Sequence, residues 1–120
     1  MSIARKGPLF LSPPHPGAVL KDELKARGLS AHALALALRL PASRIGQIVR
    51  GRRAITPDTA LRLARYLSGS AAIWLRLQAA HDLAQAEAAL GGRISAEVMP
   101  MAACLDVVAR KQKRTQRGSL

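Results

Sequence analysis

The sequence predicts an all-α protein built as one small domain. Its 120 residues fit one domain and leave little room for a second. Hydrophobic residues make up 49% of the chain, but the aromatic ones among them are only Phe10, Tyr66 and Trp74. The apolar residues are therefore mainly alanine and leucine, which are good helix formers, whereas strands prefer β-branched and aromatic side chains.

The first three helices are predicted from apolar spacing and from start and stop residues. One helix opens over 16–20 and ends at Gly28, with inward positions at Val19, Leu20 and Leu24. A second begins after the N-cap Ser30 and runs to Leu38, with inward positions at Leu34, Ala35 and Leu38. A third covers roughly 42–50 and ends at Gly51, and its apolar stripe is Ile45, Ile48 and Val49.

Two further helices follow a clear boundary at Thr56-Pro57-Asp58, where a capping residue, a first-turn proline and an acid succeed one another. The fourth helix runs to about Leu67, with Leu61, Leu63, Ala64 and Leu67 available to the core. The fifth is capped by Ser70 and is expected to end near Leu90, because Gly91-Gly92 follows. Its apolar stripe is Ile73, Leu77, Ala80 and Ala84, beside a second stripe of Trp74, Gln78 and His81.

These elements divide the chain into three regions. Residues 1–16 are proline-rich and are predicted to form an extended arm, and 17–92 form the helical domain. Residues 93–120 form a C-terminal extension, with a short helix expected over Ala102–Val108. The extension ends in a basic run, residues 110–117, which is either a solvated disordered end or a tail that adds non-specific DNA affinity.

The charge balance indicates a polyanionic partner. Nineteen Lys and Arg residues against seven Asp and Glu residues give a formal net charge of +12, and nucleic acid is the default partner for such an excess. A membrane surface, an acidic protein or RNA of the ribosomal kind are rival partners on charge alone. No uncharged apolar stretch approaches the ~18 residues of a membrane span. A single cysteine, Cys104, excludes an internal disulfide, which favours a cytoplasmic protein.

The sequence shows no pattern of a metal, cofactor or catalytic site. Its three histidines, His15, His32 and His81, have no second His or Cys at metal-ligand spacing, so a zinc site is not expected. There is no glycine-rich phosphate loop, and Cys104 has no evident base. We expect a protein that is not an enzyme and that uses no cofactor.

The second and third predicted helices, over residues 30–50, match a helix-turn-helix motif by their lengths and three-residue turn. In that motif the second helix enters the DNA major groove, and here its exposed face would offer Ser43, Arg44, Gln47 and Arg50. Arginine pairs with guanine, glutamine with adenine and serine with either base. The following loop carries Arg52 and Arg53 for phosphate contacts, and the helix start near Thr56 offers backbone amides to phosphate.

Several segments taken together resemble HigA-type antitoxins, the plasmid-maintenance or addiction-module antidote proteins of the Xre helix-turn-helix group. They extend over about residues 13–100 and comprise Pro14-His15-Pro16-Gly17, Gly28-Leu29-Ser30, Gly51-Arg52-Arg53-Ala54-Ile55-Thr56-Pro57, Ala60-Leu61-Arg62-Leu63-Ala64, Trp74-Leu75, Leu77-Gln78 and Asp82-Leu83. The resemblance implies a five-helix, lambda-repressor-like fold. It also implies a homodimer that binds a palindromic operator in its own promoter and neutralises a HigB/RelE-type ribonuclease toxin by forming a complex.

By position, the resemblance assigns base reading to Ser43, Arg44 and Gln47, and backbone contacts to Arg50, Arg52 and Arg53. The chain departs from the family pattern at four positions. Ala31 stands where a polar phosphate contact is usual, a role that His32 is placed to take, and Leu36 stands where an exposed polar residue is expected. Arg39 replaces the usual turn glycine, and Pro41 replaces the usual capping Ser or Thr.

Two questions stay open at this point. The stripe of Trp74, Gln78 and His81 belongs either to the core or to a dimer or partner interface, where Trp is enriched as an anchor. The chain is either an antitoxin or a free-standing Xre-type regulator without a toxin. A general nucleic-acid-coating protein is a further alternative, but it would need stacking aromatic residues, which are nearly absent.

Overall fold

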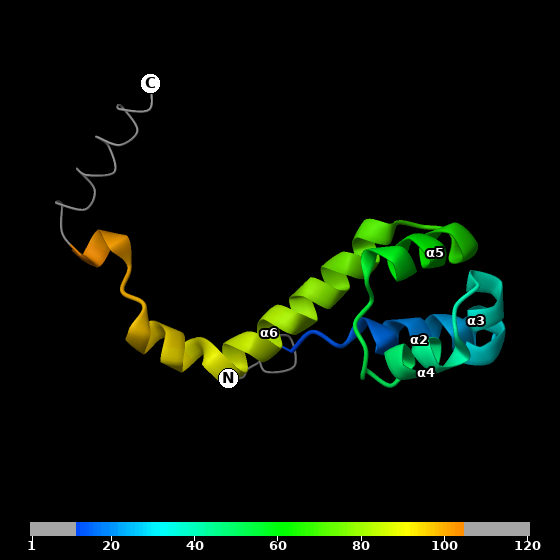
Figure 1. Cartoon of the computed structure of the whole chain (residues 1–120), viewed down its shortest axis with the longest axis horizontal. Coiled ribbons are helices and arrows are strands. Elements are labelled where there is room, and N and C mark those ends of the chain that lie inside the picture. Colours follow the sequence, from blue (N-terminus) through cyan, green and yellow to red (C-terminus); the bar gives the residue numbers. More distant parts are fainter. Residues whose placement is uncertain (1–11, 105–120) are drawn as a thin grey trace, which may run out of the picture. The chain divides into compact units, whose positions relative to one another are not determined.

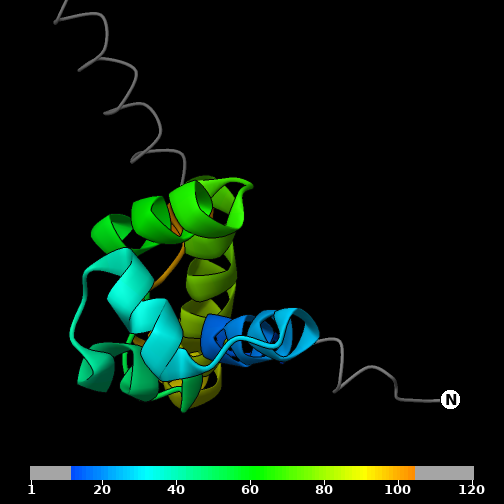
Figure 2. The same ribbon diagram turned by 90° about the vertical axis from the view of Figure 1, so that its right-hand side faces the viewer.

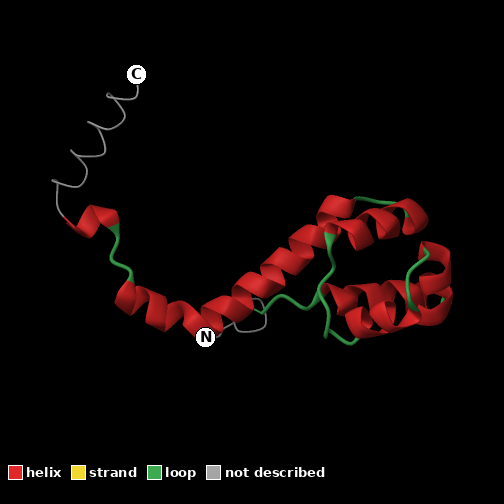
Figure 3. Cartoon of the chain, in the orientation of Figure 1, coloured by secondary structure: helices red, strands yellow, loops and turns green. Residues whose placement is uncertain are grey.

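The computed structural model describes residues 12–104, and every regular element in that range is helical (Figure 3). The elements are α2 (Pro16–Arg27), α3 (Ala31–Leu38), α4 (Ala42–Val49), α5 (Pro57–Leu67), α6 (Ala71–Glu97) and the 3-10 helix η1 (Met101–Cys104). The chain divides into two units between Gln85 and Ala86, so that α6 begins in the first unit and ends in the second. The prediction of an all-α protein with five α-helices is confirmed.

The helix starts follow local capping chemistry. The Ser30 hydroxyl accepts a hydrogen bond from the Ala33 amide at 3.0 Å, and the Thr56 hydroxyl accepts one from the Thr59 amide at 3.4 Å. Both residues act as the predicted N-caps. The Ser70 hydroxyl likewise accepts from the Ala72 amide at 3.1 Å. Pro41, by contrast, precedes α4 without a side-chain cap.

The first unit is built around one core of leucine, isoleucine and alanine side chains. Helices α2–α5 and the first turns of α6 surround it (Figures 1 and 2). Its buried members are Leu20, Leu24, Leu34, Ala35, Leu38, Ile45, Ile48, Ile55, Ala60, Leu63, Leu67 and Trp74. The inward positions predicted for α3 are confirmed, but Leu61 is 64% exposed, because Ala60, Leu63 and Leu67 form the buried face of α5.

Gly17 brings the first turn of α2 against the backbone of α4. A Cβ atom at this position would overlap the carbonyl oxygen of Ile48. The preceding residue, His15, caps α2 with its Nδ1 atom, which accepts from the Gly17 amide at 2.8 Å. Pro16 occupies the first helical position, where its missing N–H costs nothing. The His15-Pro16-Gly17 segment therefore fixes α4 through backbone contact with α2.

The predicted end of the last helix was wrong. Helix α6 continues through Gly91 and Gly92 to Glu97. A glycine ends a helix when the chain turns into the left-handed region, as it does at Gly28, where φ is 64°. If the chain stays helical, each glycine costs only about 1 kcal/mol, and the backbone hydrogen bonds are retained. Of the short helix expected over Ala102–Val108, residues 105–108 lie outside the described range.

Candidate nucleic-acid interface

Helix α4 has one polar face, and its opposite face is buried in the core. Ile45 and Ile48 are completely buried, whereas Ser43 and Arg50 are exposed and Gln47 is half-buried. The helix-turn-helix turn is tight, since Arg39 ends α3 with a φ of 61° and its amide donates to the Leu36 carbonyl. Ser43 and Arg50 are thus on the exposed face that the sequence predicts, whereas Gln47 lies at its edge and is half-buried.

The α4–α5 loop (residues 50–56) is held in place at both ends. The Gly51 and Arg52 amides donate to the Ile48 and Gln47 carbonyls at 2.9 and 2.8 Å, which closes the end of α4. Gly51 has a φ of 74°, a conformation that suits glycine. At the other end, Ile55 is buried, and its amide donates to Gln78 Oε1 at 2.8 Å. Arg52 and Arg53 are exposed on this anchored loop.

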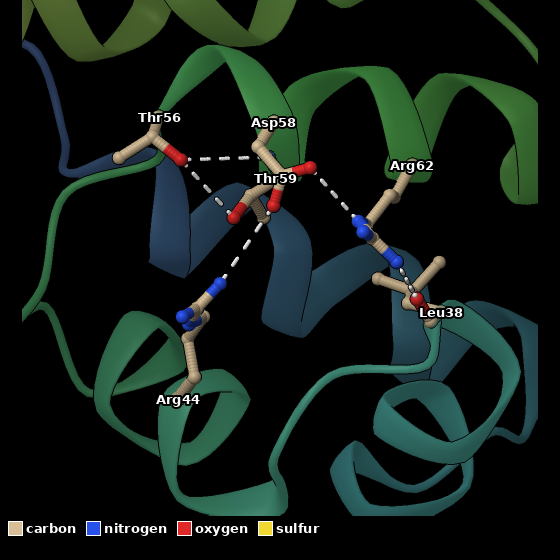
Figure 4. A network of polar contacts seen from close by, with 6 residues as sticks. All are labelled: Leu38, Arg44, Thr56, Asp58, Thr59 and Arg62. Atoms are coloured by element: carbon tan, nitrogen blue, oxygen red, sulfur yellow. Dashed lines mark hydrogen bonds and ion pairs between the residues drawn. The ribbon is translucent and has the colours of Figure 1, made fainter.

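Arg44 is placed differently from the other polar residues of α4. Its side chain points towards the start of α5, where Nη1 lies 3.8 Å from Asp58 Oδ2 (Figure 4). The side chain is only 33% exposed, and its Nε is buried without a hydrogen-bond partner among the described residues. The pairing of Arg44, a predicted base-reading residue, with Asp58 is not evident from the sequence, because the two residues meet only in the folded chain.

The start of α5 is a poorer phosphate site than the sequence suggests. Thr56 is exposed, but its hydroxyl already accepts from the Thr59 amide, and its carbonyl accepts from the Ala60 amide at 2.8 Å. Pro57 has no N–H, and the Asp58 carboxylate places a negative charge in this first turn. His32, a further residue expected at phosphate, is exposed on α3.

Trp74 and Gln78 lie in the core of a single chain. They are 8% and 7% exposed, and their burial favours the core role over an interface role for this stripe. Gln78 also donates from Nε2 to Asp82 at 3.0 Å, so that both ends of its amide are bonded. The expected stripe of Ile73, Leu77, Ala80 and Ala84 is the more exposed one, with Ile73 at 53%. No pattern in the sequence indicates that Gln78 bonds the α4–α5 loop.

His81, on α6, contacts the segment that precedes α2 (residues 13–15). Its Nδ1 lies 3.0 Å from the Pro13 carbonyl oxygen, and its ring meets that of His15 edge to face at 5.1 Å. Burial lowers the pKa of His15 and the neighbouring His81 lowers it further, while Asp82 acts in the opposite direction. A neutral His15 keeps the Nδ1 lone pair that caps α2.

Two findings concern metal binding and membrane spanning within residues 12–104. In this range no three His, Cys, Asp or Glu side chains gather closely enough to hold a metal ion. No helix among these residues is long and apolar enough to cross a membrane.

Comparison with known proteins agrees with this geometry. A helix-turn-helix family model matches residues 20–74. Virulence-associated protein I of Dichelobacter nodosus is 60% identical over 74 residues, which are 61% of this chain and 68% of that protein.

Two solved structures match a larger part of the chain. A HigA-family addiction module antidote protein from Coxiella burnetii has a TM-score of 0.71 and 42% identity, covering 74% of this chain and 98% of the other. The Pseudomonas aeruginosa antitoxin HigA, solved with the higBA promoter, has a TM-score of 0.72 and 44% identity over the same shares. The chain belongs to the HigA-type family of Xre helix-turn-helix proteins.

Proposed function

We propose that this protein is a DNA-binding antitoxin that represses its own operon. The observation that carries the proposal is the polar surface of α4 and the α4–α5 loop, in which the exposed Ser43 and Arg50 and the half-buried Gln47 are followed by the exposed Arg52 and Arg53. Both segments are anchored by buried groups, so these side chains are presented on a preorganised frame. The promoter-bound HigA relative supports DNA as the ligand.

Within this surface, Ser43 and Gln47 contact base edges. Arg44 contacts a base as well once its ion pair with Asp58 is broken. Arg50, Arg52 and Arg53 bind phosphates, with His32 as a further contact on α3. Thr56 contributes as the cap that starts α5 and sets the end of the loop. Phosphate contacts fix the register of the protein on the duplex, whereas base contacts give sequence preference.

The test is a binding titration on the protein's own promoter fragment and on an unrelated duplex of equal length, at physiological salt. We expect a promoter preference of about a thousandfold or more. Gln47→Ala should reduce the preference about 10-fold or more, whereas Arg52→Ala should weaken both duplexes alike and reduce the salt slope by about 1. Lys25→Ala, on α2, removes the same charge outside this surface and is the control. Equal affinity of the wild-type protein for both duplexes would refute the proposal.

We propose a homodimer on a palindromic operator. Because Trp74 and Gln78 are buried, the exposed apolar face of α6 that includes Ile73 and Leu83 is the better dimer surface. These side chains are 53% and 61% exposed in the single chain. Light scattering coupled to size-exclusion chromatography should give a dimer for the wild-type protein and a monomer for Ile73→Lys/Leu83→Lys. A wild-type monomer at micromolar concentration would exclude this arrangement.

The toxin partner proposed is a HigB/RelE-type ribonuclease, bound in a stable complex. Its source would be a neighbouring gene for a small basic protein. Expression of the neighbouring gene's protein alone should inhibit growth, and co-expression of the present chain should restore growth. The two proteins should also co-purify. If the neighbouring gene encodes no such ribonuclease, the protein is a free-standing Xre-type regulator, and the DNA-binding part of the proposal stands unchanged.

A further inference from the structure

Polar contacts join α3, α4 and α5 beside the proposed recognition surface (Figure 4). Asp58, in the first turn of α5, accepts a hydrogen bond from Arg62 Nε at 3.0 Å through Oδ1. Its other oxygen, Oδ2, lies 3.8 Å from Arg44 Nη1. Arg62 in turn donates from Nη1 to the carbonyl oxygen of Leu38, the last residue of α3, at 2.8 Å. One carboxylate thus lies between an arginine of α4 and an arginine that secures α3.

The two arginines are held to different degrees. Arg62 makes two directed hydrogen bonds at 3.0 and 2.8 Å, so its position is fixed. The Arg44 contact of 3.8 Å is longer than a charge-assisted hydrogen bond, and Arg44 Nε is buried without a partner among residues 12–104. Arg44 is therefore retained by the charge of Asp58 and not by a complete set of hydrogen bonds. The hold of Asp58 on Arg44 is therefore weaker than its hold on Arg62.

We propose that Asp58 is a specificity-determining positioning residue that acts through Arg44. The inference rests on the proposed DNA-binding function. A phosphate offers Arg44 another anion that can accept two hydrogen bonds from the guanidinium fork, as the Asp58 carboxylate can, so the exchange gains little. A guanine edge that the phosphate contacts bring into register also offers two parallel hydrogen bonds, and these depend on the base that is present. Asp58 therefore withholds Arg44 from non-specific phosphate contacts and releases it to the correct base.

A purely structural role for Asp58 accounts for only part of this arrangement. An acid in the first turn of a helix interacts favourably with the helix dipole, and the Arg62 pair has the stabilising i,i+4 spacing. Both effects act on the stability of α5. Neither requires Arg44, which comes from a different helix, to turn towards the same carboxylate. The stabilising role of Asp58 is therefore measured by the melting temperature, and its role through Arg44 by the preference for promoter DNA over an unrelated duplex.

The experiment uses full-length Asp58→Asn, Arg44→Gln and the double variant, with Kd measured on the promoter and on an unrelated duplex at several salt concentrations. Asp58→Asn should tighten binding to the unrelated duplex about 5- to 10-fold and steepen its salt slope by about 0.9, the value for one additional phosphate contact. The promoter preference should fall correspondingly. In the Arg44→Gln background, Asp58→Asn should change neither quantity.

Glu23→Gln is the matched control, because it also removes one carboxylate and one i,i+4 ion pair, that with Arg27 at 3.1 Å on α2. The proposal is overturned if Glu23→Gln reproduces the effect of Asp58→Asn, or if that effect persists without Arg44. If Asp58→Asn melts below the assay temperature, the same titrations are made with Asp58→Ser below its own melting transition, and unchanged binding to the unrelated duplex would overturn the proposal. A wild-type protein without promoter preference would instead refute the proposed function.

Discussion

Replacing Gly17 by alanine tests the close approach of α2 to α4. The added Cβ would overlap the carbonyl oxygen of Ile48, which is a backbone atom and cannot rotate away. Retreat of α4 is also opposed, because the Ile48 side chain is completely buried in the core. The two helices must therefore separate, and part of the packing between them must be lost.

The expected cost follows from two opposing effects. Overpacking a close-packed site costs about 1–3 kcal/mol, while replacing a helical glycine by alanine gains about 0.5–1 kcal/mol. Because the clash is with a backbone atom, the overpacking cost should lie in the upper part of its range, at about 2–3 kcal/mol, and the free energy of unfolding should fall by about 1–2.5 kcal/mol. For a domain of this size each kcal/mol shifts Tm by about 4–8 °C, so Tm should fall by about 4–20 °C.

Thermal unfolding followed by circular dichroism measures this shift. Gly92→Ala is the matched control: Gly92 is also helical, but a Cβ there would meet nothing within 4 Å, so Tm should stay the same or rise slightly. Below its melting transition, Gly17→Ala should also bind the promoter more weakly, since α4 is displaced. A Gly17→Ala protein that melts at or above the wild-type temperature would show that α2 and α4 do not approach as described.

Three further predictions concern single residues. Gln78→Leu should lower the free energy of unfolding by about 1–3 kcal/mol in urea titrations, because the buried Ile55 amide loses its acceptor; an unchanged midpoint would contradict this. Arg39→Gly should raise Tm by several degrees, since it relieves a left-handed backbone conformation that costs about 1–2 kcal/mol, more than the added glycine entropy. Because the pKa of His15 is lowered in the folded state, unfolding takes up a proton, so Tm should be constant above about pH 6.5 and fall below it. His15→Asn, which keeps a cap acceptor but does not titrate, should weaken this pH dependence.

The parts of the fold that local chemistry determines could be predicted from the sequence. Ser30 and Thr56 cap helices, and Gly28 ends one in the left-handed conformation, because each acts on backbone groups within four residues of itself. The buried positions of α3 likewise follow from helical spacing. The choice between two neighbouring stripes on α6 did not follow, since the stripe of Ile73, Leu77, Ala80 and Ala84 is the more apolar one and only tertiary packing selects the stripe with Trp74.

The candidate site was predicted as a set of residues but not as a set of contacts. The exposed positions of Ser43 and Arg52 follow from periodicity and loop position. The retention of Arg44 by Asp58 does not, because residues 14 positions apart meet through the packing of α4 against α5. The bond from the Ile55 amide to Gln78 spans 23 positions for the same reason. Contacts of this kind depend on the fold as a whole.

Three long-range contacts converge on residues 42–56, which form α4 and the α4–α5 loop and carry the proposed DNA surface. Gly17 fixes α4 from the side of α2, Gln78 fixes the α4–α5 loop from α6, and Asp58 retains Arg44 from α5. Each flexible arginine ordered on binding costs side-chain entropy, and a mobile loop would add a backbone cost of about 1–2 kcal/mol per residue. Anchoring the loop in the free protein removes the backbone cost before DNA arrives. Loss of Gln78 should therefore weaken promoter binding by more than the loss of a single phosphate contact, although Gln78 is itself buried away from solvent.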